Sequence, residues 1–123
     1  MNVAALLRSI VAVVLGYAIF ATSAFALFRV TGHDPHAPAS LAFMVVTVLE
    51  GVVFATAGGY VAAWLAGRRP VAHGVAVAVV LAAGALASLV ATLGHGAVWT
   101  QVTALLFMAP SAALGGWWRA RAN

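Results

Sequence analysis

Glu50 is the only acidic residue within the long apolar segments of this chain, and it lies near the middle of one of them. A charged carboxyl group at that depth of a bilayer costs roughly 2.5 to 3.5 kcal/mol on insertion scales, so a functional role is the first hypothesis to consider. A structural role is also open, in which a neutral Glu50 hydrogen-bonds to a threonine, a backbone carbonyl or Arg29. The sequence favours this structural role over proton coupling.

Histidines are the second group of residues that could do chemistry. His33, Asp34, His36 and His95 are all expected in connections on one side of the membrane, where two loops could together hold a divalent metal ion. The spacing from His33 to His36 is loose, however, and prolines interrupt that loop. We therefore expect no metal and no other cofactor, and keep the histidines only as weak candidates.

Signatures of catalysis are absent from the sequence. It contains no glycine-rich phosphate loop, no nucleophile elbow, no paired carboxylates and no metalloprotease helix motif. There is no cysteine, which excludes disulfides, thiolate metal sites and thiol catalysis. The sequence therefore predicts a protein that is not an enzyme.

The amino-acid composition indicates the environment and the fold that surround these residues. Hydrophobic residues make up 65% of the 123 residues and charged residues only 7%, and the mean hydropathy is +1.10. Such values are typical of a chain that lives in lipid. In lipid the backbone must satisfy its own hydrogen bonds, and continuous runs of alanine, valine and leucine lack the alternation of barrel strands. The predicted fold class is all-α.

Four apolar segments are each close to the roughly 20 residues that a helix needs to cross a bilayer. They cover about residues 9–28, 41–66, 71–93 and 98–118. Their connections are short, so consecutive helices are expected to be antiparallel neighbours. The prediction is a single membrane domain, residues 1–123, that forms an integral membrane up-down-up-down four-helix bundle.

Local signals mark several helix ends. Ser40 is a candidate N-cap for the second helix, and Pro70 has the fixed backbone angle that suits the start of the third. Pro110 removes one backbone hydrogen bond near Leu106, so a kink is expected in the fourth helix.

The arginines predict the orientation in the membrane. All six basic side chains are arginines, and only Arg29 is expected on one side. The other five, expected on the opposite side as topology or lipid-head arginines, are Arg8, Arg68, Arg69, Arg119 and Arg121. By the positive-inside rule both termini are cytoplasmic, in a multi-pass protein of the bacterial inner membrane. The net charge of +4 is thus a topology signal, and nucleic-acid binding is not expected.

A signal peptide is the alternative for the first segment. Ala24-Phe-Ala26 follows an apolar run and resembles a cleavage site. The apolar run is about twice as long as the usual apolar region of a signal peptide. We therefore expect an uncleaved first helix.

Small residues recur at three- and four-residue spacing on the second and third expected helices. The predicted packing residues are Gly51, Ala55, Gly58, Gly59, Ala62, Gly74, Ala78, Ala82 and Ala85. Such stripes allow helix backbones to approach closely in lipid, where apolar side chains gain little from association. They predict a structural seam between helices.

Two longer motifs carry a resemblance. The stretches 57–74, AGGYVAAWLAGRRPVAHG, and 108–117, MAPSAALGGW, resemble a broad group of uncharacterised small four-span bacterial membrane proteins. In that group a glycine-rich second helix ends in an arginine-proline turn that is followed by a histidine. The resemblance covers about half of the chain and implies the four-span architecture, without an activity.

Two functional hypotheses follow. The first is a non-catalytic accessory or structural subunit of a larger bacterial membrane complex, of respiratory or photosynthetic type, with membrane lipid and other integral membrane subunits as partners. The alternative is a small proton-coupled transporter with Glu50 as the coupling carboxyl. Chain length and helix count are similar to those of small multidrug-resistance exporters. Those exporters carry their essential glutamate in the first helix, where this chain has no acid.

Overall fold

The chain folds into helices alone over the part that the computed structural model describes, residues 2–122. Its elements are, in order, α1 (Val3–Thr31), α2 (Leu41–Ala66), α3 (Pro70–Thr92), α4 (Trp99–Thr103), a π-helical turn η1 (Ala104–Met108) and α5 (Ala109–Arg121). The last three run on without a break and form a fourth helical segment. The expected all-α class is thus confirmed, and α1, α2 and α3 are each long and apolar enough to cross a membrane.

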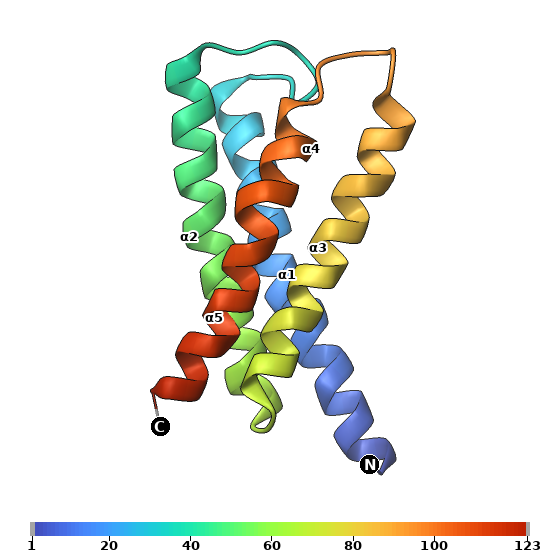
Figure 1. The fold of residues 1–123 in the computed structure, drawn as a ribbon, viewed down its shortest axis with the longest axis vertical. Helices are drawn as coiled ribbons and strands as arrows, with labels where there is room; N and C mark the ends of the chain where they lie inside the picture. Colours follow the sequence, from blue (N-terminus) through green and yellow to red (C-terminus); the bar gives the residue numbers. More distant parts are fainter. Residues whose placement is uncertain (1, 123) are drawn as a thin grey trace.

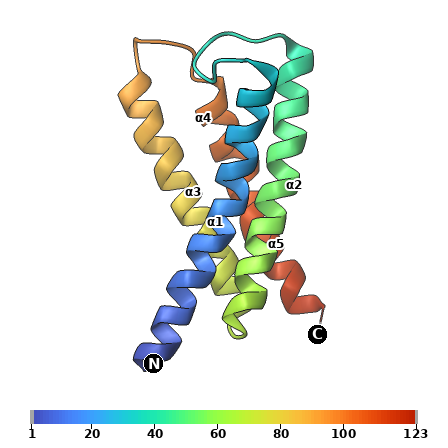
Figure 2. The ribbon, with the colours of Figure 1, turned by 180° about the vertical axis from the view of Figure 1, so that it is seen from behind.

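Consecutive helices run in opposite directions, and the two chain ends lie at the same end of the molecule (Figure 1). The central helix is α2, which packs against α1, α3 and α5, while α3 also packs against α5. Seen from behind, α3 diverges from α4 toward the upper end, and the N-terminal part of α1 extends away from the other helices (Figure 2). Grooves lie at both ends, one lined by α1, the first loop, Ser88 and Thr100, and the other by α1, α3 and the turn before α3.

Helix α1 begins earlier than the sequence predicted. It starts at Val3 rather than near Ser9, and Asn2 caps it by accepting a hydrogen bond from the Ala5 amide at 2.7 Å. The predicted range, about residues 9–28, covers only the apolar run after Arg8, and the helix extends beyond it at both ends. A single arginine does not end a helix, and Arg8 Nε donates to the carbonyl of Leu65 near the end of α2 at 2.7 Å.

The ends of α2 and α3 agree with the local signals. Ser40 caps α2 by accepting from the Phe43 amide at 3.2 Å, and α3 begins at Pro70. Between these helices Gly67 adopts a left-handed conformation with φ of 71°, which suits glycine because it lacks a Cβ. The turn 67–69 therefore reverses the chain within a few residues.

The fourth helical segment differs from the expected continuous helix over residues 98–118. Pro110 has no amide hydrogen to donate, and the helix accommodates it through the π-helical turn that immediately precedes α5. Within that turn the Ala109 amide donates to the Ala104 carbonyl, five residues back. The expected irregularity is present, and it takes the form of a π turn.

The core is made mostly of small side chains. Ala55, Ala62, Val77 and Ala112 are fully buried, and Val77 is the largest of the completely enclosed residues. Larger apolar side chains lie mainly on the outside, as expected for helices that face lipid. Close approach between helices therefore depends on residues with little or no side chain.

Candidate functional site

Glu50 lies on the part of α2 that faces partly outward. Its side chain is half-buried, and one and three turns further along the same face are Phe54 and Val61. Both of these residues line a groove between α1 and α2 with a volume of about 580 Å³. Because Gly16 of α1 lies against Gly58 of α2, the antiparallel pairing brings Glu50 to about the level of residue 24 of α1.

Within residues 2–122 the carboxyl group of Glu50 makes neither a hydrogen bond nor an ion pair. The threonines of its own helix are engaged elsewhere, since Thr47 donates to Phe43 and Thr56 donates to Val52, both at backbone carbonyls. Arg29, the expected charged partner, is exposed in the last turn of α1. The hydrogen bond that the sequence suggested for Glu50 is thus missing from the described part of the chain.

Helix crossings are built on pairs of small residues. A Cβ added to Gly16 would come within 2.5 Å of the carbonyl oxygen of Gly58, and one added to Gly59 would overlap the carbonyl of Ala112. At the third crossing, a Cβ on Gly74 would lie 2.5 Å from the Cα of Gly116. The α1–α2, α2–α5 and α3–α5 contacts are therefore direct contacts between backbones.

The other small residues that the sequence predicted as packing residues differ in their burial and in their neighbours. Ala55 and Ala62 are fully buried in α2, whereas a Cβ on Gly51 would meet the flexible side chain of Met108. On α3 the alanines are partly buried and pack on the core cluster; they are Ala78, Ala82 and Ala85. Sequence reasoning missed the partners of this seam on the first and fourth segments, which are Gly16, Ala112, Gly115 and Gly116.

A polar cluster at the end opposite the chain termini centres on Gln101, whose side chain is only 4% exposed. Its amide nitrogen lies 3.1 Å from Ser88 Oγ, 3.4 Å from Thr92 Oγ1 and 3.3 Å from His36 Nδ1, and its amide oxygen accepts from Thr100 Oγ1 at 2.9 Å. Because the amide nitrogen can only donate, His36 Nδ1 is the acceptor. Gln101 thus ties α3 to the first loop.

That first loop, residues 32–40, is held against the start of α4. Trp99 Nε1 donates to the Ala37 carbonyl at 2.9 Å, and the Ala97 amide donates to the His36 carbonyl at 2.8 Å. Below these bonds Phe28, Phe43 and Trp99 form an aromatic cluster, with ring centroids 5.7 to 6.2 Å apart. These contacts fix the loop over the end of α1 and the start of α2.

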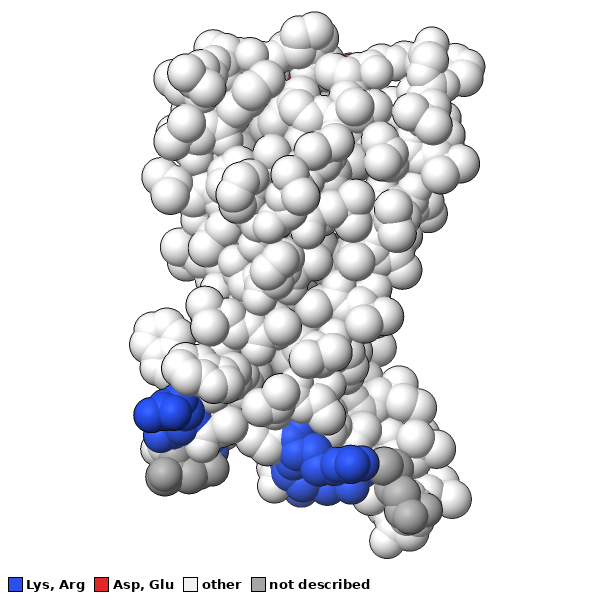
Figure 3. All heavy atoms as spheres, viewed as in Figure 1, with Lys and Arg blue, Asp and Glu red and all other residues white. Residues whose placement is uncertain are grey.

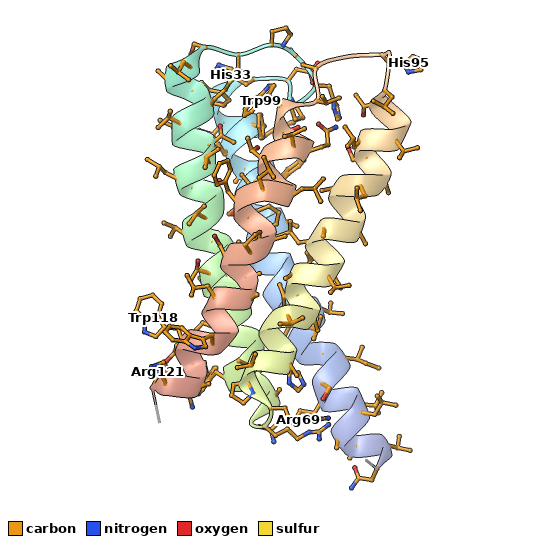
Figure 4. All side chains as sticks on the ribbon, viewed as in Figure 1. His33, Arg69, His95, Trp99, Trp118 and Arg121 are labelled. Carbon is orange, nitrogen blue, oxygen red and sulfur yellow. The ribbon has the colours of Figure 1, made fainter. Side chains whose placement is uncertain are left out.

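A cavity of about 750 Å³ opens beside this loop, and its polar lining residues are Arg29, His33, His36, Ser88 and Thr100. The candidate metal ligands do not converge here. His33 stacks on Phe43 at 3.7 Å, His95 Nδ1 bonds to the Leu93 carbonyl at 2.9 Å, and the two histidines lie on opposite sides of the upper end (Figure 4). No group of three metal-binding side chains occurs among residues 2–122.

A second polar cluster lies at the other end of the molecule. His73 is 7% exposed; its Nδ1 is 2.9 Å from the Arg69 carbonyl, and its Nε2 is 2.9 Å from Ser9 Oγ. Since a carbonyl only accepts, Nδ1 carries a proton and donates to the Arg69 carbonyl. Ser9 in turn accepts from Arg68 Nη2 at 3.3 Å. This chain of hydrogen bonds links α1 to the turn between α2 and α3.

Basic side chains gather at this same end, where the chain termini lie (Figure 3). Arg69 and Arg121 are seen there among the side chains of Figure 4. Two guanidinium groups lie over aromatic rings, Arg119 at 5.8 Å from the centroid of Tyr60 and Arg121 at 5.1 Å from that of Trp117. The opposite end carries one arginine, Arg29, together with Asp34, so the charge is strongly asymmetric along the helix axes.

Three comparisons, with protein-family models, with curated proteins and with solved structures, find no match to this chain. The class of the protein is therefore defined by its own fold. All-helical structure, with three helices long and apolar enough to cross a membrane, is that of a helical membrane protein.

Proposed function

We propose that this protein is a non-catalytic subunit of a larger bacterial membrane assembly, in which α1 and α2 receive a transmembrane helix of another chain. The observation that carries the proposal is Glu50, a half-buried residue whose accessible carboxyl group has no hydrogen-bond partner among residues 2–122. In lipid an unsatisfied polar group is costly, and a hydrogen-bonding side chain on a neighbouring helix removes that cost.

The groove beside Glu50 has the surface that such a helix would require. Most of its lining is apolar, with Leu15 and Ile19 from α1 and Phe54, Val61 and Leu65 from α2. Thr22 and Ser23 of α1 also line it. The backbone seam between α1 and α2 lies behind these walls and is already filled within the chain. A partner helix would therefore pack on the side chains of the groove, with Glu50 as its polar contact.

The charge distribution supports an orientation in the inner membrane. Five of the six arginines lie at the end that holds both termini, so by the positive-inside rule this end is cytoplasmic. The exposed tryptophans Trp64, Trp117 and Trp118 suit the interface at that end. In this orientation the fourth helical segment completes an up-down-up-down bundle of four spans.

Site-specific photo-crosslinking tests the proposed docking surface. A crosslinking amino acid at Phe54 or Val61 is expected to react with one defined membrane protein in intact cells, whereas the same amino acid at the exposed Val79 of α3 is not. Glu50→Leu is expected to lower the crosslink yield about three- to tenfold, because one interhelical hydrogen bond is lost. Glu50→Gln can still form a hydrogen bond and should retain most of the yield.

The matched control is Leu49→Ala, which trims the exposed neighbour of Glu50 and keeps the carboxyl. Its crosslink yield should equal that of the unmodified chain. Equal crosslinking from Val79, or an unchanged yield in Glu50→Leu, would contradict the docking proposal. If crosslinks formed only between copies of this chain, the partner helix would come from a second copy, and the assembly would be a homo-oligomer.

A proton-coupled transporter is the second candidate, and the same observation favours it. A half-exposed carboxyl without a fixed partner can bind and release a proton during a transport cycle. Purified protein in vesicles with an entrapped pH-sensitive dye separates the two proposals. Proton movement that Glu50→Gln abolishes supports the transporter, and no proton movement by the unmodified chain supports the subunit.

A further inference from the structure

A groove between α1 and α3 opens at the arginine-rich end of the molecule. Its volume is about 440 Å³, and its inner walls are the apolar side chains of Ile10, Val13, Val14, Ala76 and Val80. Its remaining lining includes the polar residues Ser9, Arg68, Arg69 and His73. The groove is thus apolar in its depth and basic at its mouth.

The length of the groove suits one leaflet of a bilayer. From Arg69 to Val80 it extends about 16 Å along α3, at roughly 1.5 Å per residue. This is about half of the roughly 30 Å hydrocarbon core, so an acyl chain of the leaflet next to Arg69 would be matched in depth.

No acidic side chain among residues 2–122 lies near the mouth to balance its positive charge. The only two acidic side chains are Asp34, in the first loop at the opposite end, and Glu50, in the middle of α2. Arg68 uses one donor on Ser9, and its other guanidinium hydrogens are free of any side-chain acceptor within residues 2–122. An anion from outside the chain would therefore balance the positive charge of the arginines at this end.

The basic groups are also held in place. The hydrogen-bond chain from Arg68 through Ser9 and His73 to the Arg69 carbonyl fixes the turn against α1. Arg69 has a left-handed backbone with φ of 45°, an uncommon conformation for a residue other than glycine. The turn thus presents two guanidinium groups beside the first turn of α3, where no side chain caps the helix and an anion is favoured.

We infer that this groove binds an anionic glycerophospholipid, with the phosphate at Arg68 and Arg69 and one acyl chain between α1 and α3. The basic mouth selects the headgroup charge, and the apolar walls accept the chain. The site is separate from Glu50 and from the α1–α2 groove.

The purified full chain, loaded with lipid in detergent and analysed by native mass spectrometry, tests the site. Phosphatidylglycerol is expected to be retained in preference to phosphatidylcholine with the same acyl chains. The double variant Arg68→Gln, Arg69→Gln should lower this preference on the order of tenfold, since each basic residue near the surface contributes to attraction of anionic lipid. The matched control, Arg119→Gln with Arg121→Gln, removes the same charge at the same end and should lower it less than threefold.

The acyl chain is tested by filling the groove while its arginines are kept. Ala76→Phe and Ile10→Trp place bulk on the α3 and α1 walls respectively, and both should reduce retention of phosphatidylglycerol. A variant is included only when its thermal unfolding in detergent matches that of the unmodified chain. Because the two substitutions lie on different walls of the groove, the test remains possible if one variant does not fold.

Three outcomes would overturn the inference. Equal loss in the two arginine pairs would mean diffuse attraction by charge alone. Unchanged retention in a folded groove-filling variant would remove the acyl chain from the groove. If glycerol phosphate displaced the lipid at a concentration comparable to that of the lipid, the groove would bind only the anionic group and not the acyl chain.

Discussion

Replacing Gly59 with valine is expected to destabilise this protein by about 3 kcal/mol, the upper part of the usual range for overpacking. A Cβ at this position would lie 2.8 Å from the carbonyl carbon of Ala112 and would overlap the carbonyl oxygen, so α2 and α5 must move apart. Backbone atoms cannot rotate away as the end of a side chain can. The facing Gly115 is equally constrained, since its Cβ would lie 2.8 Å from the Tyr60 amide nitrogen.

Thermal or denaturant unfolding of the purified protein in detergent measures this effect, and Gly84→Ala is the matched control. A Cβ on Gly84 would meet only Tyr17 Oη, at an ordinary 3.5 Å, on an exposed part of α3. Alanine is the better helix former by roughly 0.5 to 1 kcal/mol, so this variant should be as stable as the unmodified chain or more so. If Gly59→Val were as stable as Gly84→Ala, backbone contact would not hold the α2–α5 crossing.

Gln101→Leu is expected to lower stability by about 2 kcal/mol and to loosen the first loop. The substitution removes the amide that Ser88, Thr92 and His36 share, at about 0.5 to 1.5 kcal/mol for each hydrogen bond lost. Because His36 accepts from Gln101 and its carbonyl also accepts from Ala97, faster hydrogen exchange is expected at the Ala97 amide.

Hydrogen–deuterium exchange with peptide-level mass spectrometry provides the measurement, together with unfolding in detergent. Ser111→Ala is the control, because Ser111 is also buried but donates only to the Phe107 carbonyl of its own helical segment, at 2.6 Å. It should cost less than about 1 kcal/mol and leave exchange in the loop unchanged. Unchanged exchange in Gln101→Leu would show that the aromatic cluster and the hydrogen bonds from Trp99 and Ala97 hold the loop without Gln101.

Much of the fold followed from residue patterns. The bounds of α2 were predicted at both ends, and those of α3 within one residue, since Ser40, Gly67 and Pro70 are local signals whose effect does not depend on distant residues. The start of α1 was missed because an arginine beside an apolar segment ends neither the helix nor its packing. Pro110 was recognised as a disruption, but hydropathy carries no information on how a helix will absorb it.

The candidate sites were less accessible to sequence reasoning. Glu50 was singled out at once as an intramembrane acid, but its lack of a partner among residues 2–122 emerged only from the packing. Gln101 was overlooked, although it is the only glutamine in the chain and sits inside an apolar segment. An amide inside an apolar segment, like an acid, must find partners in a medium without water.

The sequence by itself determined the helical class, the apolar lengths and the charge asymmetry, because each of these depends only on composition and on the order of residues along the chain. Tertiary structure decided which small residues face one another, as Gly16 faces Gly58 and Gly59 faces Ala112. It also decided that Ser9, Arg68 and His73 meet at the mouth of one groove. Such pairings depend on how helices cross, and crossings are set by contacts between residues far apart in the sequence.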